Sequence, residues 1–413
     1  MKVLIVSTFD IAGGAAQGAY HLCKSLQSLG VEAGMLVQFK ASDDLAVLGS
    51  QNRLKEKYNW VRFHLDQLPT KLYRNRTRTL FSPAWLPNRN IVTAINRSDA
   101  DIVNLHWITG GMMRIEEIAQ IRKPIVWSLH DMWPFTGGCH YDEGCGRYTS
   151  HCTTCPVLGS NQSTDLSYAV FSRKAKTYAK FSSLTIVGLS RWITDCARNS
   201  MVFSGRTVVN IPSLIDITAF RPLDKTVARD LLNLPQNKKL VLFGGDGMVR
   251  DPRKGYRELN RALDIVRTRD LELVVFGSGN FERQFRYKFP VHYLGHLPND
   301  LTLRIAYSAA DVMVMPSLQE VLGWVSAESL ACGTPVVTFD IEGPRDIVEH
   351  RVNGYRAVPG NSASLAEGID WVLDYPEPEY LSQNARQTVL NKFEATMVAK
   401  RYRELYSSII GSE

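Results

Sequence analysis

The 413-residue sequence contains no apolar run of 18 residues, so it predicts no helix that spans a membrane. It also lacks low-complexity tracts, and its 45% hydrophobic and 22% charged residues are typical of a globular chain. The first apolar run, Lys2–Ser7, is short and leads into a glycine-rich turn, which favours a first strand over a signal peptide. These absences predict a cytoplasmic protein in which the seven cysteines are reduced.

A large excess of charge of one sign is also missing. The formal net charge of +7 fits an anionic ligand or an anionic membrane surface as well as it fits nucleic acid. Because no nucleic-acid-binding motif accompanies this charge, we expect no nucleic-acid partner. The chain is too long for one ordinary core and predicts two domains of about 200 residues each.

Residues 310–349 are the most informative part of the chain. The pattern predicts a buried strand (Val312–Met315), a loop, a helix that ends at Gly333, and a second apolar strand (Pro335–Phe339). The loop of such a βαβ unit lies at the carboxyl ends of the strands, where open α/β sheets bind ligands. Glu320 falls in this loop and Glu328 on the helix.

The eight-residue separation of Glu320 and Glu328 limits what the two carboxylates can do together. If most of the span is helical, at about 1.5 Å per residue, they lie roughly 10–12 Å apart along the chain direction. The acid and base of a glycosidase lie about 5–9.5 Å apart. The two glutamates therefore suit separate parts of one long ligand, with Gly323 allowing close backbone approach and the helix start offering N–H groups to a phosphate. A nucleotide diphospho-sugar has this layout.

The pattern PS-x2-E-x7-E-x3-CGTPVV, in which the acids are Glu320 and Glu328, resembles the signature of retaining GT-B glycosyltransferases of the group 1 (family 4) class, bacterial polysaccharide type. Two solvated helix glutamates would explain a bare E-x7-E, but not the flanking PS, CGTPVV and strands. The resemblance implies an α/β fold, GT-B, with two Rossmann-like domains facing a cleft. It implies an acceptor-side domain at 1–214, a nucleotide-sugar-binding domain at 215–392, and a C-terminal helix at 393–413 that packs back on the first domain.

Gly13 and Gly14 crowd the turn after the first strand. Their spacing, G-G-x3-G, differs from the dinucleotide fingerprint G-x-G-x2-G, and the next strand (Glu32–Phe39) ends at Lys40 without an acid for a ribose. A Rossmann dehydrogenase is therefore not predicted. The resemblance implies that Gly13 and Gly14 lie against the donor phosphates and the acceptor, whereas a plain tight turn is the alternative.

A second loop carries cations that suit a diphosphate. Arg250, Arg253 and Lys254 follow an apolar strand and precede a helix. Since a helix terminus alone contributes only about 0.3–2 kcal/mol toward a bound anion, fixed cations are also needed. The resembled family usually has an arginine six residues before this lysine, where the present chain has Met248. We expect Arg250 or Arg253 to replace it, and a solvated basic loop is the alternative.

The resemblance also assigns roles to residues outside the two glutamates. His130 directly follows the apolar run 124–129 and resembles the family's active-site histidine, which lies beside the transferred sugar. Gly295 is implied to lie by the nucleotide base. Glu328 would accept hydrogen bonds from the ribose, and Glu320 would bind hydroxyl groups of the donor sugar. Lys254 would stabilise the charge on the leaving diphosphate.

Four of the seven cysteines fall within 17 residues, at Cys139, Cys145, Cys152 and Cys155. The last two form a C-x2-C pair, which suits zinc, but the outer spacings match no standard zinc module. A structural zinc site, disulfides and packed reduced thiols are all open from the sequence. The position of the cluster just after His130 predicts a lid over the acceptor cleft.

The segment 71–85 combines positive charge with apolar surface. Its basic residues alternate with large apolar ones: Lys71, Arg74, Arg76 and Arg78 among Leu72, Tyr73, Leu80, Phe81 and Trp85. This mixture suits an interfacial segment on anionic lipid, at about 1 kcal/mol per basic side chain, or an ordinary solvated loop. The resemblance implies that the first domain faces a glycan or polyprenyl-linked acceptor, which fits peripheral contact with the inner face of the cell membrane.

Together these features predict a retaining glycosyltransferase that uses a UDP- or GDP-sugar, needs no cofactor for its chemistry, and acts in surface or exopolysaccharide synthesis. Another GT-B enzyme, such as a sugar-nucleotide epimerase or a phosphorylase, would share the fold but not the E-x7-E signature. A non-catalytic nucleotide-sugar-binding protein would be expected to have lost Lys254 or one of the two glutamates. All three residues are present.

Overall fold

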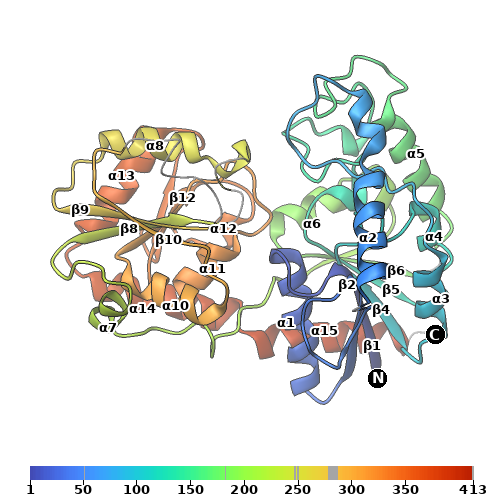
Figure 1. Cartoon of the computed structure of the whole chain (residues 1–413), viewed down its shortest axis with the longest axis horizontal. Coiled ribbons are helices and arrows are strands. Elements are labelled where there is room, and N and C mark those ends of the chain that lie inside the picture. The colour runs from blue at the N-terminus through green and yellow to red at the C-terminus, as the bar shows by residue number, and fades with distance from the viewer. Residues whose placement is uncertain (51, 182, 246–247, 249–250, 278–286, 412–413) are drawn as a thin grey trace. The chain divides into compact units, whose positions relative to one another are not determined.

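The computed structural model describes the chain except residues 51, 182, 246–247, 249–250, 278–286 and 412–413. The chain divides into two compact units. The N-terminal unit comprises Met1–Leu214 and Ala395–Glu413, and the C-terminal unit comprises Ile215–Glu394. Each unit has one parallel sheet with helices on both faces (Figure 1).

The sheet of the N-terminal unit has seven strands in the order β3-β2-β1-β4-β5-β6-β7. The strands are β1 (Lys2–Phe9), β2 (Glu32–Phe39), β3 (Val47–Leu48), β4 (Ile102–Leu105), β5 (Ile125–Leu129), β6 (Leu184–Gly188) and β7 (Thr207–Asn210). Every residue of β4, β5 and β6 is buried, because helices cover both faces of the sheet. The order reverses between β1 and β4, which makes this the switch point where such sheets bind ligands.

Helices of several lengths cover this sheet. They are α1 (Gly14–Ser28), α2 (Arg53–Asp66), α3 (Arg89–Arg97), α4 (Ile115–Ile118), α5 (Leu166–Tyr178), α6 (Arg191–Arg198) and α15 (Ala395–Ile410), with short 3-10 turns η1 (Leu68–Leu72), η2 (Trp133–Phe135), η3 (Arg147–Thr149) and η4 (Met201–Phe203).

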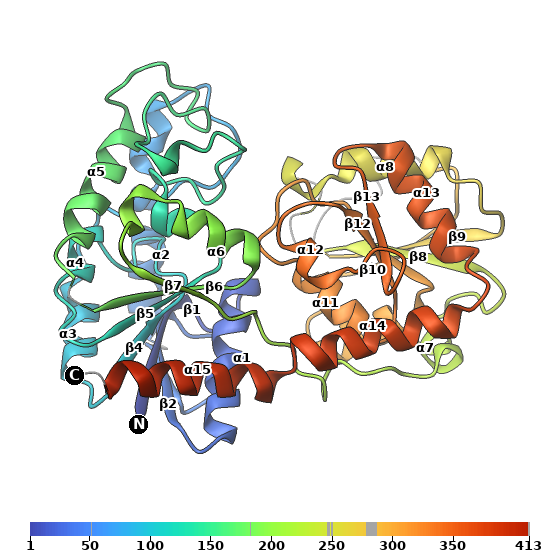
Figure 2. The ribbon, with the colours of Figure 1, turned by 180° about the vertical axis from the view of Figure 1, so that it is seen from behind.

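Helix α15 returns from the end of the chain to the N-terminal unit, where it lies beside α1 (Figure 2). Two buried hydrogen bonds fix it to the sheet. Asn104 Nδ2 donates to Tyr406 Oη at 2.7 Å, and the Ser128 and Tyr402 hydroxyls lie 3.0 Å apart. The helix starts at Ala395, two residues after the predicted start, because Phe393 is buried in the core of the C-terminal unit.

The sheet of the C-terminal unit has six strands in the order β10-β9-β8-β11-β12-β13. The strands are β8 (Lys239–Gly244), β9 (Leu271–Phe276), β10 (Val291–Gly295), β11 (Val312–Met315), β12 (Val336–Phe339) and β13 (Gly354–Ala357). Its helical elements are α7 (Lys225–Leu231), η5 (Pro252–Lys254), α8 (Tyr256–Ile265), α10 (Asp300–Ala309), α11 (Trp324–Ala331), α12 (Pro344–Ile347), α13 (Ser362–Leu373) and α14 (Pro378–Lys392).

Two apolar layers sandwich this second sheet. Leu240 and Leu242 of β8 point to the layer that contains residues of α10, α11 and α14. Val241 and Phe243 point to the opposite layer, which contains residues of α8 and α13. The alternation follows from the two-residue period of a strand, and it explains why the strand is apolar throughout. None of the helices in the described part of the chain combines the length and apolarity that a membrane crossing needs.

Candidate active site

Lys254 and Glu320 meet at the switch point of the C-terminal sheet. Lys254 ends the turn η5 that follows β8, and Glu320 lies in the loop after the neighbouring strand β11. Their Nζ and Oε2 atoms are 2.5 Å apart, with the lysine side chain 33% exposed and the glutamate side chain 14% exposed. The structure therefore brings together two of the predicted site residues that are 66 positions apart in the sequence.

The backbone explains why these two loops approach so closely. The Leu318 N–H donates to the Arg253 carbonyl at 2.6 Å, which joins the loop after β11 to the loop after β8. Gly255 follows Lys254 with φ +65°, and a Cβ atom there would lie 1.7 Å from the Pro316 carbonyl oxygen. A side chain at this position would push the loops apart, so the Lys-Gly pair is required by packing as well as by charge.

Gly323 is the N-cap of helix α11 and has φ +90°. A Cβ atom on it would lie 2.7 Å from the Met315 sulfur, at the end of β11. The glycine therefore lets the chain turn from the loop of Glu320 into the helix without displacing the strand end. The first N–H groups of α11 emerge at this turn, beside Glu320, as the sequence predicts.

Glu328 occupies the second turn of α11 and is only 7% exposed. Its Oε2 accepts a hydrogen bond from the Tyr307 hydroxyl at 2.7 Å. Burial raises the pKa of Glu328 to about 7, against the partial compensation that this hydrogen bond provides. Glu328 and the ion-paired Glu320 thus occupy different surroundings, which suits two distinct roles better than a matched acid and base.

The predicted phosphate-binding arginines have different outcomes. Arg253 forms an ion pair with Asp251, so its guanidinium is engaged within its own loop. Arg250 lies outside the described residues. Met248, which stands where the resembled family has an arginine, is 4% exposed and packs into the apolar core with Tyr256. This departure from the family pattern is therefore a core residue rather than a ligand contact.

Gly295 ends β10 at the edge of the same sheet. Its carbonyl oxygen accepts a hydrogen bond from the Gly277 N–H at 2.8 Å, just beyond the end of β9. The predicted base-contacting residue thus lies at the carboxyl edge that also carries Lys254 and Glu320, two strands away from β8.

In the N-terminal unit, Gly13 and Gly14 lie where β1 passes into α1. Gly13 is the N-cap of the helix and Gly14 its first residue. The neighbouring Asp10 is fully buried and accepts hydrogen bonds from the Ala41 and Ser42 N–H groups at 2.8–3.1 Å. Asp10 therefore ties the loop after β1 to the loop after β2, a role that its position in the sequence did not reveal.

His130 directly follows β5, as predicted, and it pairs with a second histidine. His106 follows the neighbouring strand β4, and its Nδ1 lies 2.7 Å from His130 Nε2. Burial lowers the pKa of His130 to about 4, so the pair is neutral at physiological pH. Because both rings are neutral, one of these two nitrogens donates a hydrogen bond to the other. His106 could have been found from the sequence, because it too comes directly after an apolar strand.

Asp131 organises the loop behind His130. Its Oδ2 lies 2.6 Å from His140 Nδ1 and accepts from Trp107 Nε1 at 2.9 Å, while its Oδ1 accepts from the Trp133 N–H at 2.8 Å. Burial alone would raise the pKa of Asp131, but the His140 contacts hold it below its ordinary value. His140 Nε2 completes the chain with the Ser82 hydroxyl at 2.9 Å. His140 therefore holds this loop in position through both of its ring nitrogens.

The predicted metal site involves four cysteines of the loop after His130. All four thiols (Cys139, Cys145, Cys152 and Cys155) are free, and no three His, Cys, Asp or Glu side chains among the described residues lie where they could hold a metal ion. Burial raises the pKa of Cys152 to about 12 and that of Cys155 to about 11, which keeps both thiols neutral. The structure thus shows four thiols that are not joined in disulfides, and zinc binding stays a prediction from the sequence.

Lys174 stabilises the loop that follows His130. The fully buried lysine extends from α5, and its Nζ donates to the Thr136 carbonyl at 3.0 Å and lies 3.9 Å from the centre of the Trp133 ring. Burial lowers the pKa of Lys174 to about 7. The Lys174 amino group thus satisfies backbone carbonyl groups of this loop.

A chelator is therefore expected to leave the stability of the protein unchanged. The contacts of this loop from Lys174 and from the Asp131–His140 pair are between protein groups, which removal of divalent metals leaves in place. Thermal unfolding of purified protein, before and after dialysis against a strong chelator, measures this directly. A lower Tm that zinc restores would contradict the expectation.

Comparison with known proteins places part of the chain in a family. Residues 224–388 match the family of Glycosyl transferases group 1. This stretch belongs to the group 1 glycosyltransferases. It contains Lys254, Glu320, Gly323 and Glu328, so the resemblance stated from the sequence is confirmed for the part of the chain that carries its signature.

Individual relatives agree with this assignment. The chain is 34% identical over 192 residues to an uncharacterized glycosyltransferase of Methanocaldococcus jannaschii, an overlap of 44% of this chain and 48% of that one. The chain spans about half the length of the curated relatives it matches.

Solved structures extend the likeness to the whole chain. Sucrose-phosphate synthase from Thermosynechococcus elongatus superposes with a TM-score of 0.70 at 18% identity and full coverage of both chains. Anabaena HepE in complex with UDP-glucose superposes with a TM-score of 0.65 at 18% identity, covering 99% of this chain and 100% of that one. At this identity the likeness concerns the fold, which is GT-B with two Rossmann-like domains, as predicted.

Proposed function

We propose that the protein is a retaining glycosyltransferase that moves a sugar from a nucleotide diphospho-sugar to a glycan or lipid-linked acceptor. The contact between Lys254 and Glu320 at the switch point of the group 1 domain carries this proposal. It sets a cation and a carboxylate side by side where open α/β sheets bind ligands. Glu328 lies further along the adjoining helix α11.

Each of these residues has a proposed task. Lys254 neutralises the leaving diphosphate, and Glu320 accepts hydrogen bonds from hydroxyl groups of the donor sugar. Without ligand the two side chains satisfy each other, so donor binding exchanges one ion pair for two new sets of contacts. Preorganised charge of this kind is commonly the largest contribution to catalysis. Glu328 accepts hydrogen bonds from the ribose hydroxyls.

The chemistry we propose needs no protein nucleophile and no metal. The bond between the anomeric carbon and the diphosphate oxygen breaks, and the acceptor oxygen forms the new bond on the same face. The acceptor proton leaves with the diphosphate. His130, kept neutral by burial and oriented by His106, positions the sugar. A neutral imidazole suits this role because it can donate a hydrogen bond without adding charge.

The donor is a UDP- or GDP-sugar, and the HepE structure with UDP-glucose is support for the first of these. For the acceptor we propose a glycan or polyprenyl-linked sugar in surface or exopolysaccharide synthesis. A polyprenyl-linked acceptor would bring the enzyme to the inner face of the cell membrane. A non-catalytic binding protein is less well supported, since Lys254, Glu320 and Glu328 are all present and two of them are in contact.

A nucleotide is expected to stabilise the protein in a way that depends on Glu328. At 100 times its dissociation constant, the correct nucleotide or sugar nucleotide adds about 2.7 kcal/mol to the free energy of unfolding. Thermal unfolding with UDP, GDP, ADP and their common sugar conjugates tests this and identifies the base. Glu328→Ala should abolish the shift, because it removes the acceptor for the ribose.

The matched control is Glu379→Ala, which removes an exposed glutamate of the same unit. This variant should keep the full nucleotide-dependent shift. The proposal is wrong if folded wild-type protein responds to no nucleotide, or if Glu328→Ala responds as strongly as the wild type does.

A further inference from the structure

Helix α2 has the reverse of the usual amphipathic arrangement. The side chains that it buries are Asn59, Arg62 and Asp66, which share one face at the three-and-four spacing of a helix. A surface helix of a globular protein ordinarily turns an apolar stripe to the core and polar residues to solvent. The sequence pattern gave no prediction of this helix for that reason.

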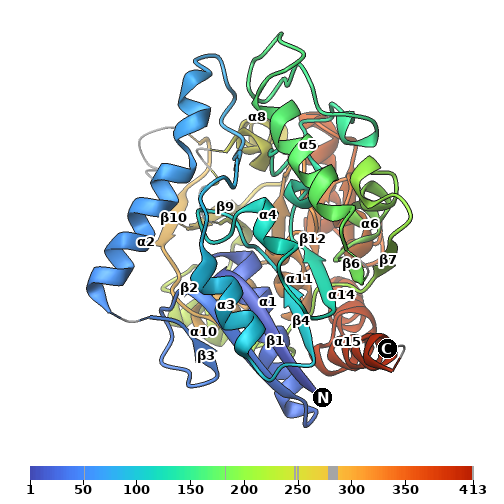
Figure 3. The same cartoon turned by 90° about the vertical axis from the view of Figure 1, so that its right-hand side faces the viewer.

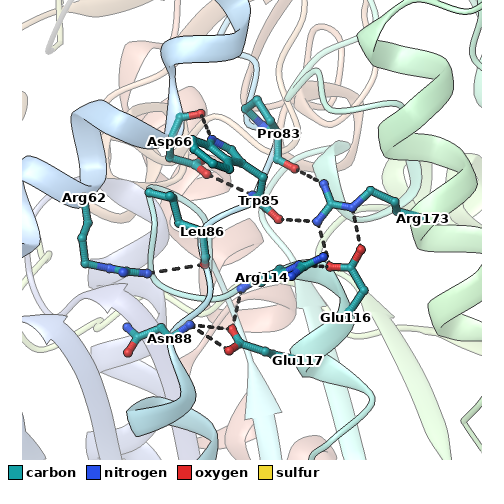
Figure 4. Close-up of polar contacts among 11 residues, drawn as sticks. Arg62, Asp66, Pro83, Trp85, Leu86, Asn88, Arg114, Glu116, Glu117 and Arg173 are labelled. Atoms are coloured by element: carbon teal, nitrogen blue, oxygen red, sulfur yellow. Dashed lines mark hydrogen bonds and ion pairs between the residues drawn. The ribbon is translucent and has the colours of Figure 1, made fainter.

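Polar contacts anchor the inward face (Figure 4), in addition to the ring contacts that Trp60 and Phe63 make with Phe39 of β2. Asn59 Nδ2 donates to the Gln38 carbonyl at 2.8 Å. Arg62 Nη2 donates to the carbonyl groups of Gly111 at 2.8 Å and Pro87 at 2.9 Å. Asp66 Oδ1 accepts from the Trp85 N–H at 3.3 Å. These buried bonds hold the helix in a fixed orientation, so the direction of its outward face is also fixed.

The outward face carries a continuous apolar stripe. Leu54, Tyr58, Val61 and Leu65 recur at the three-and-four spacing, and Leu68 and Leu72 continue it into η1. All six side chains are between 39% and 84% exposed. The helix lies along the edge of the N-terminal unit (Figure 3). Scattered exposed apolar residues are normal, but an aligned set of this size on one helix marks a surface that binds something.

Positive charge borders the stripe. Between residues 52 and 80 the exposed basic residues are Arg53, Lys55, Lys57, Lys71, Arg74, Arg76 and Arg78, and the exposed acidic residue is Glu56. The combination of an aligned apolar face with basic neighbours is typical of helices that lie in the plane of an anionic membrane surface.

We propose that α2 and the segment that follows it, residues 53–78, dock the N-terminal unit on an anionic phospholipid surface. The apolar stripe enters the boundary between headgroups and acyl chains, and the basic side chains contact the anionic headgroups. The docking element begins 18 residues before the segment 71–85 that the sequence suggested. A second copy of this chain fits less well, because pairing two stripes would bring their basic borders together without neutralising them.

Binding of the full-length protein to lipid vesicles tests the proposal. Vesicles of phosphatidylcholine mixed with phosphatidylglycerol are compared with vesicles of phosphatidylcholine alone, in a sedimentation assay at low and high salt. We expect binding to the mixed vesicles and a clear loss at high salt, because each basic side chain contributes roughly a fivefold increase in affinity that salt screens.

Two double variants separate the apolar and the charged contributions. Val61→Ser with Leu65→Ser should lower the vesicle affinity roughly tenfold or more, since both side chains would leave the acyl boundary. Arg53→Glu with Lys57→Glu should do the same by reversing charge beside the stripe. Leu231→Ser with Leu301→Ser is the matched control, because these leucines are each 60% exposed but lie on the C-terminal unit.

The proposal is independent of the proposed donor site, so a cooperative thermal unfolding transition without nucleotide serves as the test of folding for every variant. Wild-type protein that ignores the mixed vesicles at low salt would overturn it, as would Val61→Ser with Leu65→Ser binding like the wild type. Light scattering measures whether a second copy of the chain binds the stripe instead of a membrane. A dimer that needs Val61 and Leu65, with no vesicle binding, would assign the stripe to a second copy of the chain and overturn the membrane proposal.

Discussion

Lys254→Ala is expected to lower the rate of sugar transfer by roughly 10²- to 10³-fold, the effect of removing one preorganised group that stabilises developing negative charge. The expectation rests on what surrounds the lysine. Arg253 is paired with Asp251, two residues away in the same loop, and the position of the family's usual arginine is filled by the buried Met248. Lys254 stands at the switch point with its side chain one-third exposed, ready to exchange Glu320 for a ligand.

Rates measured at saturating donor, with each candidate sugar nucleotide that stabilises the protein, test this expectation. Loss of the ion pair should reduce the free energy of unfolding by no more than about 1 kcal/mol, because both side chains are partly exposed and the pair is screened. Arg257→Ala is the matched control, since it removes an exposed cation three residues further along the chain. Activity within a few-fold of the wild type in Lys254→Ala would show that another group neutralises the diphosphate.

The sheet strands were predictable because burial on both faces leaves a simple signal. A strand in the middle of a parallel sheet must be apolar at every position, and the stretches between strands then show where the helices fall. The strands Glu32–Phe39 and Val312–Met315 have the same bounds in the structure as in the sequence analysis. The fold class followed from this alternation and from the family signature.

The helix α2 was not predictable in the same way. Hydrophobic periodicity assumes that the apolar face is the buried one, whereas α2 buries an amide, a guanidinium and a carboxylate. Their partners are backbone groups around residues 38, 85–87 and 111, which come together only in the folded unit. The local sequence pattern cannot predict contacts between residues that are far apart along the chain.

The candidate site was also only partly predictable from the sequence. The identity of Lys254, Glu320 and Glu328 followed from the signature, but their surroundings depend on the order of the strands. Lys254 meets Glu320 because β8 and β11 are neighbours, and Glu328 is buried because Tyr307 covers it from α10. The zinc site suggested by the cysteine spacing stays a prediction, because closeness in sequence does not by itself make four side chains converge on one point.

Glu328 should make the stability of the protein depend on pH. The buried carboxyl group has a pKa of about 7 in the folded protein, against an ordinary value of 4.5. Between these values the folded state holds a proton that the unfolded state has released. The stability that Glu328 contributes is therefore fully present below pH 4.5 and is lost as the pH rises through 7. A shift of this size corresponds to about 3 kcal/mol.

Glu328→Gln is expected to remove this dependence, because the amide has the shape of the protonated acid and its oxygen can still accept from Tyr307. Urea unfolding at pH 5 and pH 8 should show the variant gaining about 2–3 kcal/mol relative to the wild type as the pH rises. Glu379→Gln, at an exposed position, should show no such gain. Equal pH dependence in wild type and Glu328→Gln would mean that Glu328 is ionised well below pH 7.

If the ribose hydroxyls do bind the ionised carboxylate, nucleotide affinity of the wild type should rise over the same pH range. At pH 8, Glu328→Gln should then be more stable than the wild type but bind nucleotide more weakly. The ionised carboxylate of Glu328 lowers the stability of the empty protein, and the same carboxylate accepts the hydrogen bonds of the donor.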